Sequence, residues 1–215
     1  MSSNNSINYL LNPKNWWLPL LIIFIVSICG VAMIGIHTYT EAPPIPNYTT
    51  EKGEVIISKE DILKGQAVFQ EYALMEYGSM FGDGANRGPD YTAEALHRMS
   101  EYMNDYYRSG LISVQNSELA VKGAQEQVKY EIKVNRYDKN TNSVKLADSQ
   151  VAAFSNLEEY YKNIFTNPAF AGSFKPMGYI SDVEDIKSLS KFFFWGAWVC
   201  GVERPGETYS YTHNW

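Results

Sequence analysis

A run of 21 uncharged residues, from Trp16 to Ile36, constrains this chain more than any other feature. About 20 apolar residues in a helix span the hydrocarbon core of a bilayer. Trp16 and Trp17 lie at one end of the run and Tyr39 lies just beyond the other, as aromatic residues at membrane interfaces often do. The run therefore predicts a transmembrane helix, and we assign residues 1–40 to an N-terminal membrane anchor.

A cleaved signal peptide is the alternative interpretation of this run. A signal peptide has a shorter apolar stretch and ends in a small-residue cleavage site, which Ala42-Pro43-Pro44 matches poorly. Lys14 is the only charged residue before Glu41, and it favours a cytoplasmic N-terminus. We therefore expect an uncleaved, single-pass anchor in the cytoplasmic (inner) membrane, with residues 41–215 forming one domain on the extracytoplasmic side.

The composition of the chain excludes one class of partner. The chain has 18 basic and 24 acidic residues, a formal net charge of −6, and Lys14 is its only charged residue before residue 41. A nucleic-acid partner requires a basic patch, so we expect none. Cys29 lies inside the apolar run and Cys200 lies near the C-terminus, so we expect no disulfide and a domain stabilised by packing alone.

Residues 41–215 have mainly helical patterns. Apolar residues recur there at helical spacing, and an Asp- and Asn-rich turn indicates one small β-hairpin. The predicted fold is mainly α: one N-terminal transmembrane helix, then an extracytoplasmic helical domain with a small β-hairpin. The predicted helices cover about 59–77, 90–110, 117–134, 149–167 and 181–201, and the hairpin covers 136–146.

Two of these helices carry more detailed expectations. In the helix over 90–110, four apolar residues share one face and form an expected buried stripe: Leu96, Met99, Met103 and Tyr106. The last helix begins with Ser181-Asp182-Val183-Glu184, which has the pattern of a capping box.

The last predicted helix contains five large aromatic residues between Phe192 and Trp198. Successive positions of a helix are about 100° apart, so one face cannot bury all five. We expect some of them to point away from the domain core, toward lipid headgroups or membrane-embedded partner helices. The alternative is a buried core helix, because the block is too short to span a membrane.

The stretch from Gly65 to Thr92 has the frame of a c-type cytochrome without its haem attachment. A covalently attached haem needs two Cys and an adjacent His in the pattern C-x-x-C-H. At the corresponding spacing this chain has Leu74, Tyr77 and Gly78. We therefore expect neither a thioether bond nor a proximal His ligand in this segment.

Four segments in order resemble the N-terminal part of the quinol-dependent nitric oxide reductases. The resemblance covers nearly the whole chain, and it rests on the four together because each alone is a weak signal. They are Ala42–Pro46 after the anchor; Gly65–Thr92 with His97-Arg98; Asn135–Asp138; and Phe192–Trp195 with Arg204–Gly206 and Tyr211–Trp215.

This resemblance implies one transmembrane helix and an extracytoplasmic cytochrome c-like domain that lacks haem. In that family a catalytic helix bundle follows, with two haem b groups and a non-haem iron, and it reduces nitric oxide to nitrous oxide with electrons from quinol. The ligands of those metals lie downstream of this region. We therefore expect no cofactor in this chain itself, and we expect either a part of a longer protein or a separately encoded subunit.

The resemblance also implies candidate site residues. In related cytochrome subunits the loop matching Gly84-Ala85-Asn86 helps to hold a calcium ion, so Gly84 and Asn86 are candidate ligands here. Calcium takes six or more oxygen ligands, so carboxylates of the catalytic part would have to complete the site. Arg87 is a candidate partner for haem propionates across the interface. A purely structural interface is the alternative.

Further candidate interface residues come from the C-terminal third of the chain. In the family, the tail that contains His213 lies close to the catalytic part. The aromatic block supplies the others, and together the candidates are Phe192, Trp195, Trp198 and His213. Two other functions stay open: a stand-alone anchored subunit that docks on a separate catalytic chain, and an anchored extracytoplasmic binding or sensor module.

Overall fold

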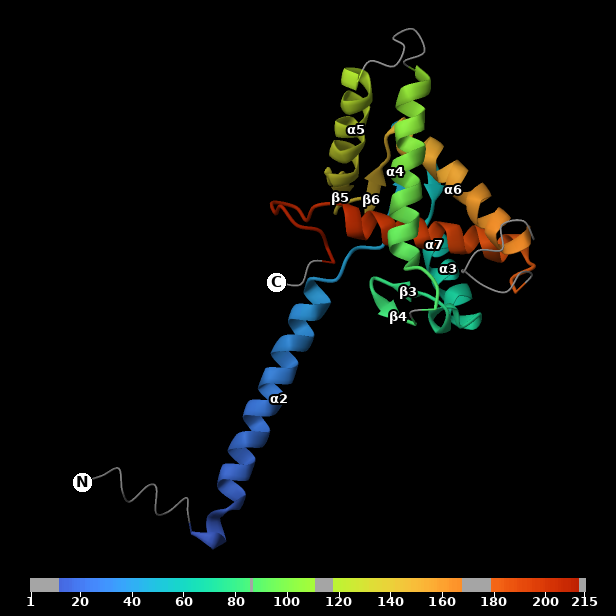
Figure 1. The fold of residues 1–215 in the computed structure, drawn as a ribbon. Coiled ribbons are helices and arrows are strands. Elements are labelled where there is room, and N and C mark those ends of the chain that lie inside the picture. Colours follow the sequence, from blue (N-terminus) through green and yellow to red (C-terminus); the bar gives the residue numbers. More distant parts are fainter. Residues whose placement is uncertain (1–11, 86, 111–117, 168–178, 213–215) are drawn as a thin grey trace. The chain divides into compact units, whose positions relative to one another are not determined.

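The structure is a computed structural model of the 215-residue chain, and it describes residues 12–85, 87–110, 118–167 and 179–212 (Figure 1). The chain divides into two compact units, Met1–Ala42 and Pro43–Trp215.

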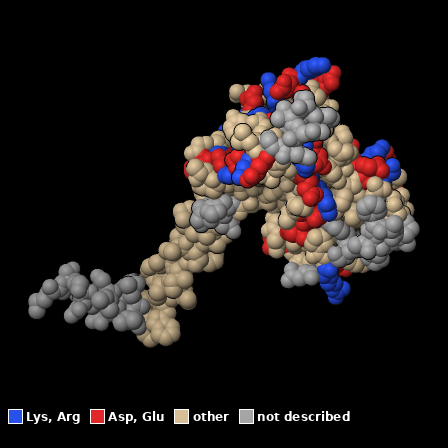
Figure 2. All heavy atoms as spheres, turned by 45° about the horizontal axis from the view of Figure 1, so that its top comes forward, with Lys and Arg blue, Asp and Glu red and all other residues tan. Residues whose placement is uncertain are grey.

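The first unit is built around one long helix. A short 3-10 helix, η1 (Pro13–Asn15), leads into helix α2 (Trp17–Thr40). Within the described residues, this is the one helix long and apolar enough to cross a membrane, and none of its side chains is buried in the structure. Figure 2 shows the visible face of this helix without basic or acidic side chains. The helix predicted from the uncharged run is confirmed.

The second unit is mainly helical, as predicted. Helix α3 (Lys59–Glu71) begins at a complete capping box, in which the Ser58 hydroxyl accepts from the Asp61 amide at 3.1 Å and the Asp61 carboxylate accepts from the Ser58 amide at 2.9 Å. The prediction that this helix continues to Tyr77 is wrong. Ala73 has a φ of 47°, which ends the helix, and a separate 3-10 turn, η2 (Leu74–Glu76), follows.

The other predicted helices are present: α4 (Tyr91–Gly110), α5 (Glu118–Lys133), α6 (Asp148–Thr166) and α7 (Val183–Gly201). On α4, Met99 and Met103 are buried as expected, whereas Tyr106 is 41% exposed and does not belong to the buried stripe. The cap of α7 lies one residue later than expected, because the Asp182 carboxylate rather than Ser181 accepts the first free amides.

One small sheet completes the domain. The predicted hairpin is confirmed as β5 (Tyr137–Asp138) and β6 (Ser143–Lys145), which pair antiparallel. Two strands of this sheet were not predicted, β1 (Asn47–Thr49) and β2 (Val55–Ile57), and the strand order is β2-β1-β6-β5. Strand β1 pairs in parallel with β6, with Tyr48 opposite Val144. The residues just after the first unit are therefore built into the centre of a sheet.

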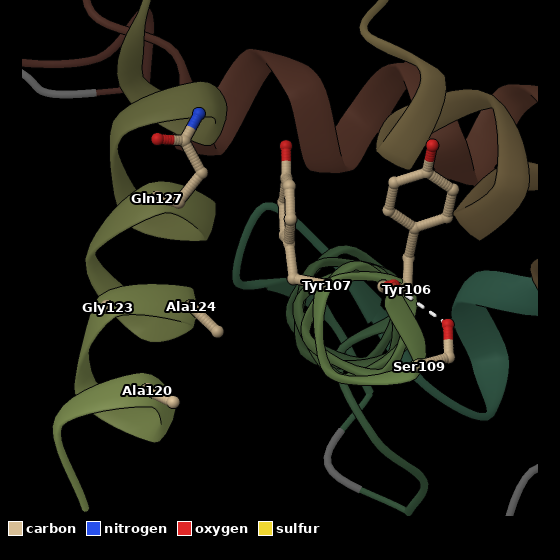
Figure 3. Close-up of a pocket in the computed structure, with 7 residues that line it drawn as sticks. All are labelled: Tyr106, Tyr107, Ser109, Ala120, Gly123, Ala124 and Gln127. Carbon is tan, nitrogen blue, oxygen red and sulfur yellow. Dashed lines mark hydrogen bonds between the residues drawn. The ribbon is translucent and has the colours of Figure 1, made fainter. Parts of the chain in front are cut away.

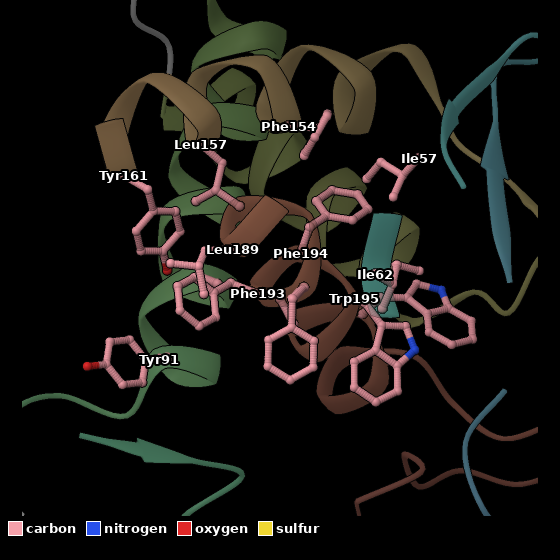
Figure 4. Packing of buried hydrophobic residues seen from close by; sticks show 14 of the residues in the cluster. Ile57, Ile62, Tyr91, Phe154, Leu157, Tyr161, Leu189, Phe193, Phe194 and Trp195 are labelled. Atoms are coloured by element: carbon pink, nitrogen blue, oxygen red, sulfur yellow. The ribbon is translucent and has the colours of Figure 1, made fainter. Parts of the chain in front are cut away.

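Helix α7 is the centre of the hydrophobic core, and α3, α4 and α6 pack against it (Figures 1 and 4). Helices α3 and α7 approach each other closely at Gly65 of α3. A Cβ atom there would lie 2.0 Å from the Ser188 carbonyl oxygen of α7 and 2.7 Å from the Phe192 Cβ. Glycine is therefore the residue that permits this crossing.

The expectation that some aromatic residues of α7 point away from the core is wrong. All five are buried, with exposed fractions from 0 to 8%. The 100° spacing argument holds for a helix covered on one face, but α7 is covered on several. Phe193 packs against Tyr91 of α4 and Tyr161 of α6, whereas Phe194 packs against Tyr48 of β1 and Phe154 of α6. Figure 4 shows Phe193 and Phe194 of α7 together with the rings of Tyr91, Tyr161 and Phe154 from other helices.

Candidate functional site

The loop between η2 and α4, residues 78–90, contains three of the seven predicted site residues. It contains a two-stranded ribbon, β3 (Ser79–Met80) and β4 (Asp83–Gly84), which pair antiparallel. Two glycines permit the close packing of this loop. A Cβ on Gly78 would lie 2.4 Å from the Pro89 carbonyl oxygen, and one on Gly84, whose φ is +140°, would lie 2.4 Å from the Gly78 carbonyl oxygen. Larger residues at either position would open the loop.

Asp90 fixes the loop to the start of α4. One carboxylate oxygen accepts from the Ser79 hydroxyl and from the Gly82 amide, both at 2.7 Å, and the other accepts from the Ala93 amide at 2.9 Å. Partial burial acts to raise the pKa of Asp90, but these hydrogen bonds stabilise the carboxylate more strongly, so its pKa lies below the ordinary value. One side chain therefore caps the helix and shapes the loop.

Replacing Asp90 with alanine should lower the free energy of unfolding by about 1–2 kcal/mol at neutral pH, since it removes a helix cap. The folded-state pKa is depressed, so this contribution is present above the unfolded pKa of about 3.9 and is lost as the pH falls through the folded value. The difference between variant and parent should therefore shrink below about pH 4. Urea unfolding of the full chain in maltoside micelles measures both effects.

The exposed Asp83, seven residues earlier in the same loop, provides the matched control. Asp83→Ala should leave the free energy of unfolding almost unchanged, because surface substitutions away from structural contacts have small effects. Equal losses in the two variants would contradict the role of Asp90.

The candidate calcium ligands, Gly84 and Asn86, and the candidate partner of haem propionates, Arg87, belong to the sequence of this loop. Gly84 and Arg87 are both exposed, and Asn86 lies outside the described residues. The loop also presents the exposed carboxylate of Asp83 beside Gly84, an oxygen donor that the sequence reasoning did not select. Within the described residues no group of three or more His, Cys, Asp or Glu side chains gathers as a metal site. Calcium binding stays a prediction, and the described loop residues offer part of an oxygen ligand set.

Phe81 is a second residue of this loop that the sequence reasoning missed. Its side chain is 37% exposed, and its ring packs edge-on against Trp195 at 5.9 Å between centroids. Its φ of 58° is unusual for a bulky residue, and the Thr92 hydroxyl holds it by accepting from the Phe81 amide at 3.0 Å. No sequence signal marks Phe81, because its conformation depends on the Asp90 and Thr92 contacts.

The positions that would carry the haem-attaching Cys in a c-type cytochrome belong to the packed domain instead. Leu74 is fully buried in the core. Beside it, Phe69, Tyr91 and Phe193 form an aromatic cluster in which the Tyr91 and Phe193 rings stack at 5.0 Å between centroids. The segment with the cytochrome-like sequence pattern therefore packs against an aromatic cluster of the core.

Three of the other candidate interface residues are buried in the domain. Phe192, Trp195 and Trp198 are 4, 8 and 6% exposed, and the Trp195 indole donates to the Pro44 carbonyl oxygen at 3.0 Å. These three stabilise the domain itself. His213 lies outside the described residues, and His97 is an exposed residue 3.4 Å from Glu101 on the same helix.

Segments distant in the sequence meet after the end of α7. The Asn135 amide donates to the Glu203 carbonyl oxygen at 2.8 Å and to the Tyr211 hydroxyl at 3.2 Å. The Arg204 guanidinium donates to the Tyr211 carbonyl oxygen at 3.2 Å and lies over the Tyr211 ring. Two of the four segments that carry the family resemblance therefore form one hydrogen-bonded corner of the domain.

Taken together, the structure defines a mainly helical domain with one small sheet and a two-stranded ribbon, in a chain that also has an apolar helix long enough to span a membrane. A family model for the cytochrome c-like domain of the nitric oxide reductase NorB matches residues 46–215. The chain belongs to this family. No curated protein matches the chain.

Proposed function

We propose that this chain is the anchor and extracytoplasmic domain of a quinol-dependent nitric oxide reductase, in which it has a structural and docking role. The family match over residues 46–215, in a chain with a helix of membrane-spanning length, carries this proposal. Catalysis belongs to the family's helix bundle, where haem b and non-haem iron supply the redox chemistry. Lys14 before the apolar helix supports the extracytoplasmic placement of the domain.

The loop of residues 78–90 is the docking surface that we propose for the catalytic bundle. It presents an exposed apolar ring, Phe81, and an exposed cation, Arg87, within seven residues. Asp90 and Gly84 hold the loop in one conformation, which limits the entropy lost on binding. Backbone strain in a bulky residue such as Phe81 persists where the surroundings enforce it and often marks a binding site. Calcium held by Gly84 and Asn86 would add an oxygen-coordinated link across this interface.

The test is affinity purification of the N-terminally tagged protein from membranes of its native host. We expect the purified material to show b-type haem absorbance and to consume nitric oxide with a quinol as electron donor. In the double variant Phe81→Ser with Arg87→Glu, we expect nitric oxide consumption to fall roughly tenfold, because an aromatic and a charged contact are lost together.

A double variant on another exposed surface is the matched control. Leu119→Ser with Lys122→Glu on α5 makes similar chemical changes at exposed positions and should keep full activity. Parent material without b-type haem and without nitric oxide consumption would contradict the proposed function. Equal activity in the two double variants would contradict the docking surface alone.

A further inference from the structure

An open groove of about 720 Å³ lies between α4 and α5, apart from the loop of residues 78–90 (Figure 3). Volumes of this size are typical of small-molecule sites. Helix α5 contributes a wall of small residues, and Gly123 has no atom within 4 Å of the position a Cβ would take. The described residues that line the groove are Tyr106, Tyr107, Ser109, Ala120, Gly123, Ala124 and Gln127.

The opposite wall of the groove is aromatic. Tyr106 and Tyr107 project from α4, with ring centroids 5.5 Å apart and planes at 87°. The two rings therefore present faces in different directions. The face of an aromatic ring is negative and attracts cations.

A buried carboxylate lies behind the groove. Glu131 is 5% exposed, and its Oε1 atom accepts from the Tyr107 hydroxyl at 2.5 Å and from the Gln127 amide at 3.0 Å. Its Oε2 atom accepts from the Ser149 hydroxyl at 2.5 Å. Among the described residues these donors are all uncharged, and no described Lys, Arg or His pairs with Glu131.

We propose that this groove binds a small organic cation, a free ammonium compound that packs against the faces of Tyr106 and Tyr107. Tyr107 donates its proton toward Glu131, which increases the electron density of its ring. The negative charge of Glu131 favours a cation in the groove, because Tyr107 and Gln127 both line the groove and both contact Glu131. The described part of the lining includes no Lys or Arg that would repel a cation.

The experiment compares choline with its neutral isostere 3,3-dimethylbutan-1-ol, which has the same shape and hydroxyl but no charge. Binding to the full chain is measured by titration calorimetry in maltoside micelles, because this detergent carries no ammonium group. We expect choline to bind roughly tenfold more tightly than the isostere, the difference that a cation–π contact in a partly desolvated site provides.

Three variants localise the binding. Gly123→Leu fills the groove and should abolish choline binding, whereas Gln125→Leu, a change to the same residue at an exposed position two residues along α5, should leave it unchanged. Glu131→Gln keeps the shape of the side chain but removes its charge, so the preference for choline over the isostere should be lost. Circular dichroism verifies that each variant is folded.

Four outcomes would overturn the proposal. They are equal binding of choline and the isostere, binding of neither, unchanged choline binding in Gly123→Leu, and binding of phosphatidylcholine nanodiscs without binding of free choline. The last outcome would assign the groove to a lipid headgroup. These results are independent of nitric oxide consumption, so they do not depend on the proposed function.

Discussion

Replacing Gly65 with alanine is expected to lower the free energy of unfolding by about 3 kcal/mol, because the added methyl group overpacks the crossing of α3 and α7. The clash is with the Ser188 carbonyl oxygen, a backbone atom that cannot rotate away. Relief would require the two helices to separate, which would disturb the packing of Phe192 as well. Urea unfolding of the full chain in maltoside micelles, followed by near-ultraviolet circular dichroism, measures the loss.

The same substitution on α5 is the matched control. A methyl group on Gly123 meets no atom within 4 Å, so Gly123→Ala should stabilise the protein by about 0.5–1 kcal/mol through its helix propensity alone. Opposite signs for the two substitutions are therefore expected. A stabilising effect of Gly65→Ala would show that the two helices do not cross as closely as in the structure.

Replacing Phe193 with alanine should cost about 3–5 kcal/mol, the range for truncating a fully buried aromatic residue. Phe193 is 0% exposed and stacks on Tyr91 at an angle of 1° between planes. Its centroid also lies 4.9 Å from that of Tyr161 and 6.0 Å from that of Phe69, so truncation removes contacts between α7 and three other helices. We expect the apparent melting temperature to fall steeply and the native near-ultraviolet signal to weaken.

Phe81 provides the comparison for this truncation. Its side chain is 37% exposed, and among the described residues its ring packs against one aromatic neighbour, Trp195. Phe81→Ala should therefore cost only about 1 kcal/mol. If Phe193→Ala cost no more than Phe81→Ala, the cluster around α7 would not be the main source of stability.

Local sequence signals predicted the helices and the hairpin well because these elements depend on neighbouring residues. The Asp- and Asn-rich turn after Asp138 is an example. Strands β1 and β2 were missed because each has only three residues, and β1 depends on pairing with β6, about 95 residues later in the chain. Such long-range pairing leaves no periodicity in so short a segment.

The aromatic block of α7 shows what helical periodicity does not predict. Spacing along a helix tells which side chains share a face, but it does not tell how many faces are covered. Phe194 and Trp198 are buried because Tyr48 of β1 packs beside both of them, and β1 was not predicted. The exposure expected for aromatic residues of this block is therefore wrong for a tertiary reason, not because the helix was misplaced.

The candidate site was predictable only in part. The resemblance pointed to this loop through Gly84, Asn86 and Arg87, and the structure explains Gly78 and Gly84 by their close backbone approaches. The contribution of Asp90 required knowledge of three partners, two of which lie eight or more residues away in the sequence. Side-chain contacts of this kind set the conformation of a loop, and they are not visible in composition or spacing.

The central position of α7 has a consequence for the order in which the domain is made. During synthesis the segments that form α3, α4 and α6 emerge before Val183–Gly201, the helix against which all three pack. The parts of these earlier helices that pack against α7 have no partner until α7 has been made. Strand β1 likewise cannot form its parallel pairing with β6 until β6 has been made. The nascent domain therefore exposes apolar surface until α7 has been made, and aggregation competes with folding during this interval.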